Sequence, residues 1–155
     1  MSDKQKVHHY MGIEMNIQTW RILGKEERNE KDDIRMINFA KASLYHWQKS
    51  PKYQPVNEQR GQWMISHVYA VLGNREEALV HAEETLRLTE NNGFKDFDLA
   101  YAYESMARAY AASGNKIECE NWWEKSKKAE NLISDNEDKK IFDRDLNSGP
   151  WYDCK

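Results

Sequence analysis

A short pattern occurs twice in the chain with the same internal spacing. Its copies consist of Ser66, Tyr69, Gly73-Asn74 and Ala78, and of Ala107, Tyr110, Gly114-Asn115 and Cys119. The two glycines lie 41 residues apart (114 − 73). Apolar residues at helical spacing precede and follow each Gly-Asn pair, and glycine takes the left-handed conformation that ends a helix without a Cβ penalty. The pattern therefore predicts two helix–turn–helix units.

Apolar periodicity predicts helices over most of the chain. In the first expected helix, the side chains of Ile13, Ile17, Trp20 and Leu23 are expected to face the core. No segment alternates in the manner of a strand. We expect one all-α domain, residues 1–155, built as an antiparallel array of six or seven helices. The expected helices cover residues 11–24, 32–49, 56–72, 76–91, 98–113, 116–134 and 137–146.

The repeated pattern resembles tetratricopeptide repeats (TPRs) over residues 56–131. In these repeats a small residue and an aromatic one precede a Gly-rich turn, and a small residue follows it. The spacing of 41 residues exceeds the ~34 residues of the plain repeat. The extra residues lie in "TENNGFKDF", where either the preceding helix is longer or the loop is wider. The resemblance implies a TPR-like superhelix with units at residues 56–91 and 98–134. A degenerate pair at 11–49 would precede them, and a capping helix and tail at 135–155 would follow. Parts of the chain also resemble small bacterial TPR-like proteins, a group that supplies no activity to carry over.

The resemblance implies a concave groove lined by the first helix of each unit. Two stripes at i, i+3, i+7 spacing agree with such a surface. They are Arg60, Trp63 and His67, and Tyr101, Glu104 and Arg108. Arginines and aromatic side chains suit a peptide or an anionic small ligand. In the alternative interpretation, Glu104 and Arg108 form an ordinary surface ion pair at i, i+4 spacing and Trp63 packs against a neighbouring helix.

The leading hypothesis is a non-catalytic adaptor that binds a protein or peptide, including a second copy of itself as a homodimer. A sensor of a small molecule or signalling peptide on the same groove is the first alternative. A hydrolase or transferase using His46 or His67 is the second. His46, near the end of a helix, is otherwise a structural histidine, and His8-His9 are expected to precede the first helix. Neither HExxH, GxSxG nor a glycine-rich phosphate loop occurs.

Charge and composition limit the partners. The net charge is −3, with seven acids and four bases in residues 130–155, and no basic stripe is present. This argues against nucleic acid as a partner. No apolar run approaches the ~20 residues of a membrane span, and the N-terminus lacks the apolar region of a secretory signal. We therefore expect a cytoplasmic protein with no membrane partner, no cofactor and no metal.

The remaining motifs are expected to be structural. Cys119 and Cys154 lack metal or redox spacing, so we expect two unpaired thiols. Asp98 is expected to cap a helix, and Asp143-Arg144-Asp145 is typical of a solvated face. The tail "GPWYDCK" carries two aromatic residues, which either dock on the array as a cap or offer a motif to a partner.

Overall fold

The protein consists of seven α-helices joined by short connections. The computed structural model describes all residues 1–155 and contains no strand, so the all-α expectation is confirmed. None of the helices is both long and apolar enough to span a membrane. In chain order the helices are α1 (Asp3–Leu23), α2 (Glu30–Gln48), α3 (Pro55–Val71), α4 (Arg75–Asn91), α5 (Asp96–Ala112), α6 (Lys116–Glu130) and α7 (Asn136–Asn147).

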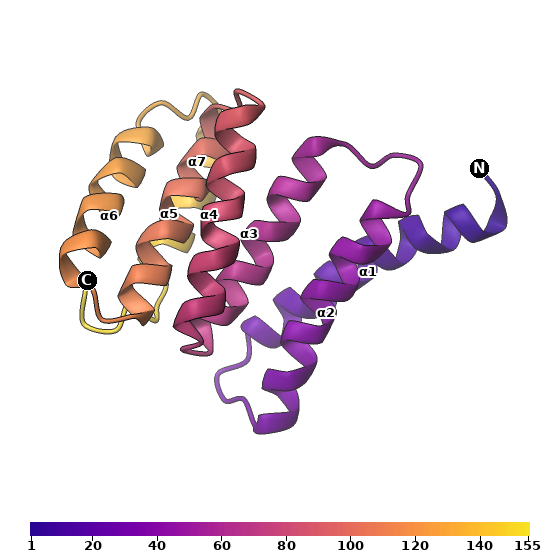
Figure 1. The fold of residues 1–155 in the computed structure, drawn as a ribbon, viewed down its shortest axis with the longest axis horizontal. Coiled ribbons are helices and arrows are strands. Elements are labelled where there is room, and N and C mark those ends of the chain that lie inside the picture. The colour runs from indigo at the N-terminus through magenta and orange to yellow at the C-terminus, as the bar shows by residue number, and fades with distance from the viewer.

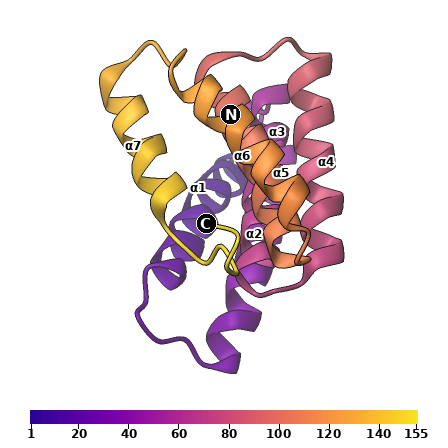
Figure 2. The ribbon, with the colours of Figure 1, turned by 90° about the vertical axis from the view of Figure 1, so that its left-hand side faces the viewer.

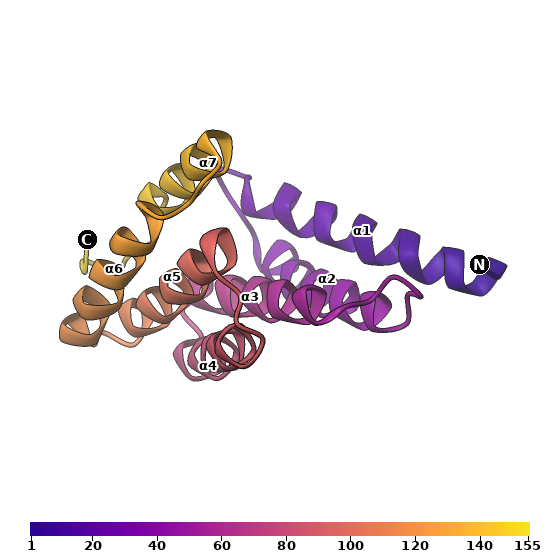
Figure 3. The ribbon, with the colours of Figure 1, turned by 90° about the horizontal axis from the view of Figure 1, so that it is seen from above.

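Neighbouring helices pack in sequential pairs. The closest associations are α1 with α2, α3 with α4 and α5 with α6, and α7 returns against α5 and α6. The two chain ends lie at opposite ends of the molecule (Figure 1). Seen from above, α4 lies on one side of α3 and α5, whereas α1 and α7 lie on the other side (Figure 3). A view from the end shows the same separation of α7 from α4 (Figure 2).

The two predicted turns are built alike. Gly73 and Gly114 both have φ 77°, in the left-handed region. The residue after each glycine donates its N–H back to the tyrosine carbonyl, over 2.9 Å from Asn74 to Tyr69 and 3.0 Å in the second copy. The small residues of both copies are fully buried where the helices meet. The predicted helix–turn–helix units are therefore confirmed.

Several helix ends differ from the expectation. The first helix begins at Asp3 rather than at residue 11, because Ser2 and Gln5 form a reciprocal capping box. His8 and His9 therefore lie inside α1. The fifth helix begins at Asp96, so Asp98 is not its cap. The sixth helix ends at Glu130 rather than at residue 134. Helix α4 continues through "TEN" to Asn91, so a longer helix accounts for part of the long repeat.

The prediction that Ile13, Ile17 and Trp20 face the core is wrong. These side chains are 42%, 43% and 40% exposed. Helix α1 instead turns Gly12 toward α2, where a Cβ on this glycine would lie 2.9 Å from Cδ1 of Trp47. The Ser43 hydroxyl donates to the Gly12 carbonyl over 2.7 Å. The close approach of the Trp47 ring and the Ser43 hydroxyl to Gly12 buries this face of α1 and leaves Ile13, Ile17 and Trp20 at the surface.

The expectation of two unpaired thiols is also wrong, because Cys119 and Cys154 form a disulfide. The tail after α7 folds back along α6, which brings together two cysteines 35 residues apart. The Trp151 ring packs edge-on against Trp123, with centroids 4.8 Å apart. The Tyr152 hydroxyl donates to the Ala70 carbonyl over 2.6 Å, at the end of α3. The tail therefore docks on the array.

Candidate functional site

An open hollow of about 290 Å³ lies between α1 and α7. These two helices lie on the side of α3 and α5 away from α4 (Figure 3). Helices α3 and α5 form its floor, and α1 and α7 form its walls. We call this hollow the α1–α7 groove. Its apolar lining consists of Trp20, Trp63, Met64, Phe97, Tyr101 and Ile141.

The groove has exposed apolar edges above a buried aromatic floor. Trp20 on α1 is 40% exposed and Ile141 on α7 is 39% exposed, on opposite walls. The Trp20 ring stacks on Trp63, with centroids 6.0 Å apart. Trp63 meets Tyr101 edge-on at 5.2 Å. Contacts between rings in these orientations fix the floor, because each ring packs against the face or edge of the next.

Beneath the floor, Trp63 is hydrogen-bonded to a buried ion pair. The indole N–H of Trp63 donates to Glu104 Oε1 over 2.9 Å, and Arg108 Nε donates to Glu104 Oε2. Both ionised side chains are almost fully buried. Burial raises the pKa of the Glu104 carboxyl, whereas the Arg108 charge and the two donated hydrogen bonds oppose that rise. The ion pair and the indole thus form one connected unit.

The other donors of Arg108 hold the end of α7 and the tail. Nη1 donates to the Ser148 carbonyl over 2.9 Å, and Nη2 donates to the Asp145 carbonyl over 2.5 Å. The guanidinium also lies over the Trp151 ring, 4.2 Å from its centroid. Glu104 and Arg108 therefore have no free group to offer a ligand. The alternative of a surface ion pair fails too, because residues 145–151 cover the pair.

Tyr101 connects the floor of the groove to α7. Its hydroxyl donates to Asp145 Oδ2 over 2.6 Å. Burial raises the pKa of the Tyr101 phenol, and the hydrogen bond to Asp145 raises this pKa further. Tyr101 contributes its ring to the groove, and its hydroxyl is occupied by the contact between helices.

Two arginines lie at the mouth of the groove, each beside an aspartate. Arg60 donates from Nε and Nη2 to Asp98, over 3.0 and 3.3 Å. Arg144 donates to Asp145 Oδ1 from Nε and Nη2, over 3.2 and 3.1 Å. The arginine side chains remain 57% and 69% exposed. Because each arginine is largely in water, its ion pair is screened and contributes modestly to stability, so the arginine can turn toward a ligand.

A second hollow, also of about 290 Å³, continues from the groove toward the tail. It shares Trp20, Trp63, Arg144 and Asp145 with the groove, and Ser148–Pro150 form one wall. His67 lines this hollow and stacks on Trp63, with ring centroids 4.8 Å apart.

The surroundings of the His67 ring favour its neutral form. Its Nδ1 atom is buried without a hydrogen-bond partner. Burial of the ring lowers the pKa of His67 well below its ordinary value, and the nearby charge of Arg108 contributes to the same shift. A neutral imidazole is therefore the form that lines the second hollow.

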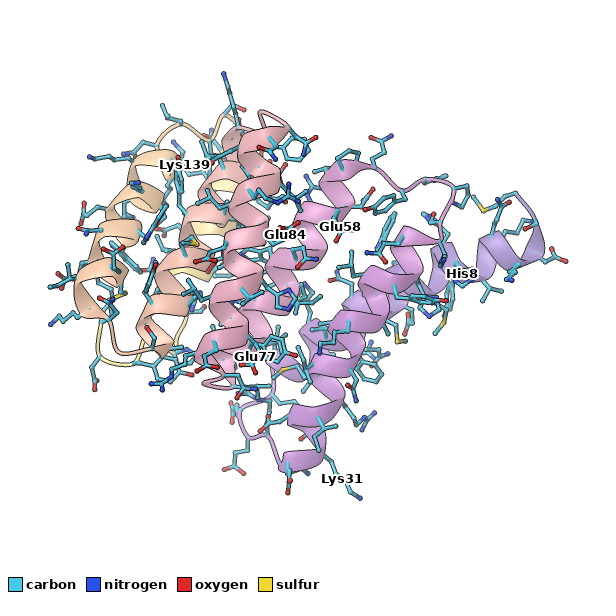
Figure 4. The ribbon with its side chains drawn as sticks, viewed as in Figure 1. His8, Lys31, Glu58, Glu77, Glu84 and Lys139 are labelled. Carbon is cyan, nitrogen blue, oxygen red and sulfur yellow. A yellow bond between two sulfur atoms is a disulfide. The ribbon has the colours of Figure 1, made fainter.

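His46 lies far from this region. Its Nδ1 is 2.9 Å from Nδ1 of His8, where α1 meets α2 (Figure 4 labels His8). One of these nitrogens must donate and the other accept, so the pair holds a single proton in this contact. Burial, and then the charge of His8, lower the pKa of His46. His46 joins two helices and forms no part of the groove.

The structure thus brings together three of the six predicted groove residues, Arg60, Trp63 and Tyr101. His67 lies next to them in the second hollow, and Glu104 and Arg108 lie beneath the floor. Sequence reasoning missed the opposite walls of the groove. Trp20 was assigned to the core, and Arg144 and Asp145 to a solvated face. The available signal was the aromatic side chain of Trp20 and the apolar side chain of Ile141. Only the tertiary arrangement places these two residues opposite one another.

No group of three or more His, Cys, Asp or Glu side chains is placed to hold a metal ion. Comparison of the chain with known proteins finds no matching family model, curated protein or solved structure.

Proposed function

We propose that this protein is a non-catalytic binding module that holds an apolar segment of a partner protein in the α1–α7 groove. The observation that carries the proposal is the pairing of exposed apolar edges, Trp20 and Ile141, above a fixed aromatic floor. Aromatic residues and arginine are enriched where proteins bind one another, and both are present here. The exposed arginines at the mouth supply polar contacts around an apolar centre.

A protein segment suits this groove better than a small molecule. The hollow is open and its volume of about 290 Å³ lies at the lower end of the ~300–1,000 Å³ typical of small-ligand sites. Small-ligand sites bury most of their ligand, whereas this groove lies open between two helices. A side chain of a partner would fill the hollow, while the rest of the partner segment would contact Trp20 and Ile141.

A sensor of a small molecule or signalling peptide remains the second candidate, favoured by one observation. Gln59 Oε1 is buried in the lining of the groove without a partner. Its orientation is fixed, because Nε2 donates to Thr89 Oγ1 and to the Asp98 carbonyl, and the Thr89 hydroxyl already donates to Thr85. A ligand donor that reached Gln59 Oε1 would satisfy this oxygen. The hydrolase or transferase hypothesis gains no supporting contact, since His46 bonds to His8 and Nδ1 of His67 is buried without a hydrogen-bond partner.

We also propose that the array is TPR-like. The support is the matching geometry of the turns at Gly73 and Gly114 and the burial of small residues at equivalent positions. On this proposal the groove corresponds to the concave surface of the array, because α3 and α5 are the first helices of their units.

The Cys119–Cys154 disulfide bears on where the protein acts. Disulfides persist in oxidising compartments and are rare in the cytosol. The disulfide therefore favours an oxidising compartment and weighs against the cytoplasmic location expected from the sequence.

Selection of peptides on the immobilised protein tests the groove. Peptides of about fifteen residues, drawn from a random displayed library, should be enriched in apolar and aromatic residues. We expect Ile141→Glu to weaken binding of the selected peptides by about tenfold or more, since a carboxylate would replace one apolar edge. Ile117→Glu is the matched control, because Ile117 is 73% exposed on α6 and does not line the groove.

Fluorescence of the groove tryptophans gives an independent measurement of the same binding. A bound peptide should change the emission of Trp20, and Trp20→Phe should remove most of that change. Selected peptides that bind wild type, Ile141→Glu and Ile117→Glu equally would place the binding surface elsewhere and contradict the proposal.

A further inference from the structure

Helix α1 exposes a row of large apolar side chains at the surface of the molecule. The row consists of Tyr10, Ile13, Ile17 and Trp20, which we call the α1 strip. Their exposed fractions are 62%, 42%, 43% and 40%. Helix α1 packs mainly on α2, and its first half extends beyond the rest of the array (Figures 1 and 3). Contiguous exposed apolar side chains commonly mark an interaction surface, so this face requires an explanation.

The composition around the strip is typical of the centre of an interface. Residues 7–20 contain one Asp, Glu, Lys or Arg residue, Glu14, although such residues make up 32% of the chain. Charged residues are depleted and aromatic residues enriched at the cores of protein interfaces. Elsewhere on the surface the outer face of α4 carries Glu77 and Glu84 (Figure 4). The depletion of charge is thus a local property of α1.

The spacing of the strip is complementary to itself. Its members follow one another at intervals of three, four and three residues, which is the a/d spacing of paired helices. The pairs 13 with 17 and 10 with 20 have the same midpoint, residue 15. A second α1 running antiparallel across this midpoint would therefore place Ile13 against Ile17 and Tyr10 against Trp20, in both directions at once. Such an arrangement has the two-fold symmetry of most homodimers.

Charge also permits this register. With the midpoint at residue 15, Glu14 of one copy comes opposite Asn16 of the other, and no like charges meet within residues 7–20. Glu14 already accepts a hydrogen bond from Gln18 over 2.8 Å. A polar carboxylate at the edge of the strip would remain in water while the four apolar side chains are covered.

We propose that the α1 strip is an antiparallel self-association surface, occupied by α1 of a second copy of this chain. The strip exposes on the order of 400 Å² per copy, about half of the ~800 Å² per partner in a standard interface. The dimer is therefore expected to be a weak, transient one. This inference goes beyond the proposed function, and Ile13 and Ile17 belong to the strip without lining the groove.

Sedimentation equilibrium at protein concentrations from about 1 μM to about 1 mM tests the dimer. Wild type should change from monomer to dimer, and Ile17→Glu should weaken the association at least tenfold. Val80→Glu should leave it unchanged, because Val80 is a similarly exposed apolar residue (61%) on α4. Circular dichroism establishes that each variant is folded. A wild type that stays monomeric throughout, or a dimer that tolerates Ile17→Glu as well as Val80→Glu, overturns the proposal.

A mixing experiment tests the antiparallel register. Ile13→Glu and Ile17→Lys should each self-associate poorly when alone. Mixed together they should form a heterodimer, because the new carboxylate at position 13 meets the new ammonium at position 17 and the remaining isoleucines meet each other. A parallel pairing would place position 13 against position 13, so the new carboxylate and the new ammonium would not meet. If mixing the two variants does not restore dimer formation, the antiparallel arrangement is overturned. The two surfaces share Trp20, but Ile141 of the groove experiment lies on α7, and Ile13 and Ile17 do not line the groove. The variants therefore distinguish failure of one proposal from failure of the other.

Discussion

Single residues in this protein are constrained by hydrogen-bond geometry as much as by polarity. Arg108 is buried, yet its guanidinium meets the Glu104 carboxylate, two backbone carbonyls and the Trp151 ring. A buried ion pair with incomplete partners would destabilise the fold, whereas this one is satisfied on both sides. Arg108 therefore serves the attachment of α7 and the tail, which in turn forms one wall of the second hollow.

We expect His67 to make the stability of the protein depend on pH. Its folded-state pKa lies well below that of the unfolded chain, because burial and Arg108 disfavour the charged ring. For such a group the stability is fully present above the unfolded value, near 6.5, and is lost as pH falls toward the folded value. The loss approaches about 1.4 kcal/mol per pH unit for one proton. The pKa values of His46 and His81 are also lowered, so these residues add to the same loss of unfolding free energy as pH falls.

We predict that His67→Phe reduces this acid sensitivity. Phenylalanine keeps the aromatic stack on Trp63 and cannot be protonated. Urea unfolding at about pH 8 should give free energies within ~1 kcal/mol for wild type and variant, whereas at about pH 5 the variant should have lost less stability. The measurement at high pH is the control for packing. An equal loss of stability in both proteins would show that His67 does not cause the pH dependence.

At the scale of whole helices, the sequence predicts what depends on neighbouring residues and misses what depends on distant ones. The turns at Gly73 and Gly114 were predictable, because glycine and its local spacing determine the end of a helix. The buried face of α1 was not, because burial there follows the close approach of Gly12 to Trp47. Counting apolar residues favoured the wrong face.

The same distinction holds for the candidate site. The i, i+4 spacing predicted contact between Glu104 and Arg108, and the contact exists. It could not predict burial, because the groups that cover the pair arrive from Asp145 and Ser148, about forty residues later in the chain. For the same reason α7 could not be recognised as a wall of the groove.

The packing of α1 on α2 leads to a prediction about Gly12. Alanine at this position gains up to ~1 kcal/mol in helix propensity. Its Cβ would lie 2.9 Å from Cδ1 and 3.2 Å from Cγ of Trp47, and the displacement of a packed ring costs about 1–3 kcal/mol. We expect Gly12→Ala to destabilise the protein by about 1 kcal/mol, measured by chemical unfolding. Gly24→Ala is the matched control, since the nearest atom to its Cβ lies at an ordinary 3.5 Å; equal stability of the two variants would contradict the argument.

Over the whole molecule, the C-terminal tail connects the end of the array back to its middle. Trp151 packs on α6 and Tyr152 bonds to the last turn of α3, so one short segment contacts helices that are distant in sequence. The Cys119–Cys154 disulfide fixes this return. Hydrogen bonds and aromatic contacts position the tail, and the covalent bond limits how far it can move when they break.

Reduction of the disulfide should therefore lower the free energy of unfolding. The cross-link spans 35 residues, and restriction of the unfolded chain by a loop of this size contributes about 2–4 kcal/mol. Cys154→Ser should have the same stability with and without dithiothreitol, close to that of reduced wild type. It is a better variant than a change at Cys119, which is fully buried in the core and would also lose packing. Unfolding midpoints that do not change when wild type is reduced would show that the noncovalent contacts of Trp151 and Tyr152 suffice to hold the tail.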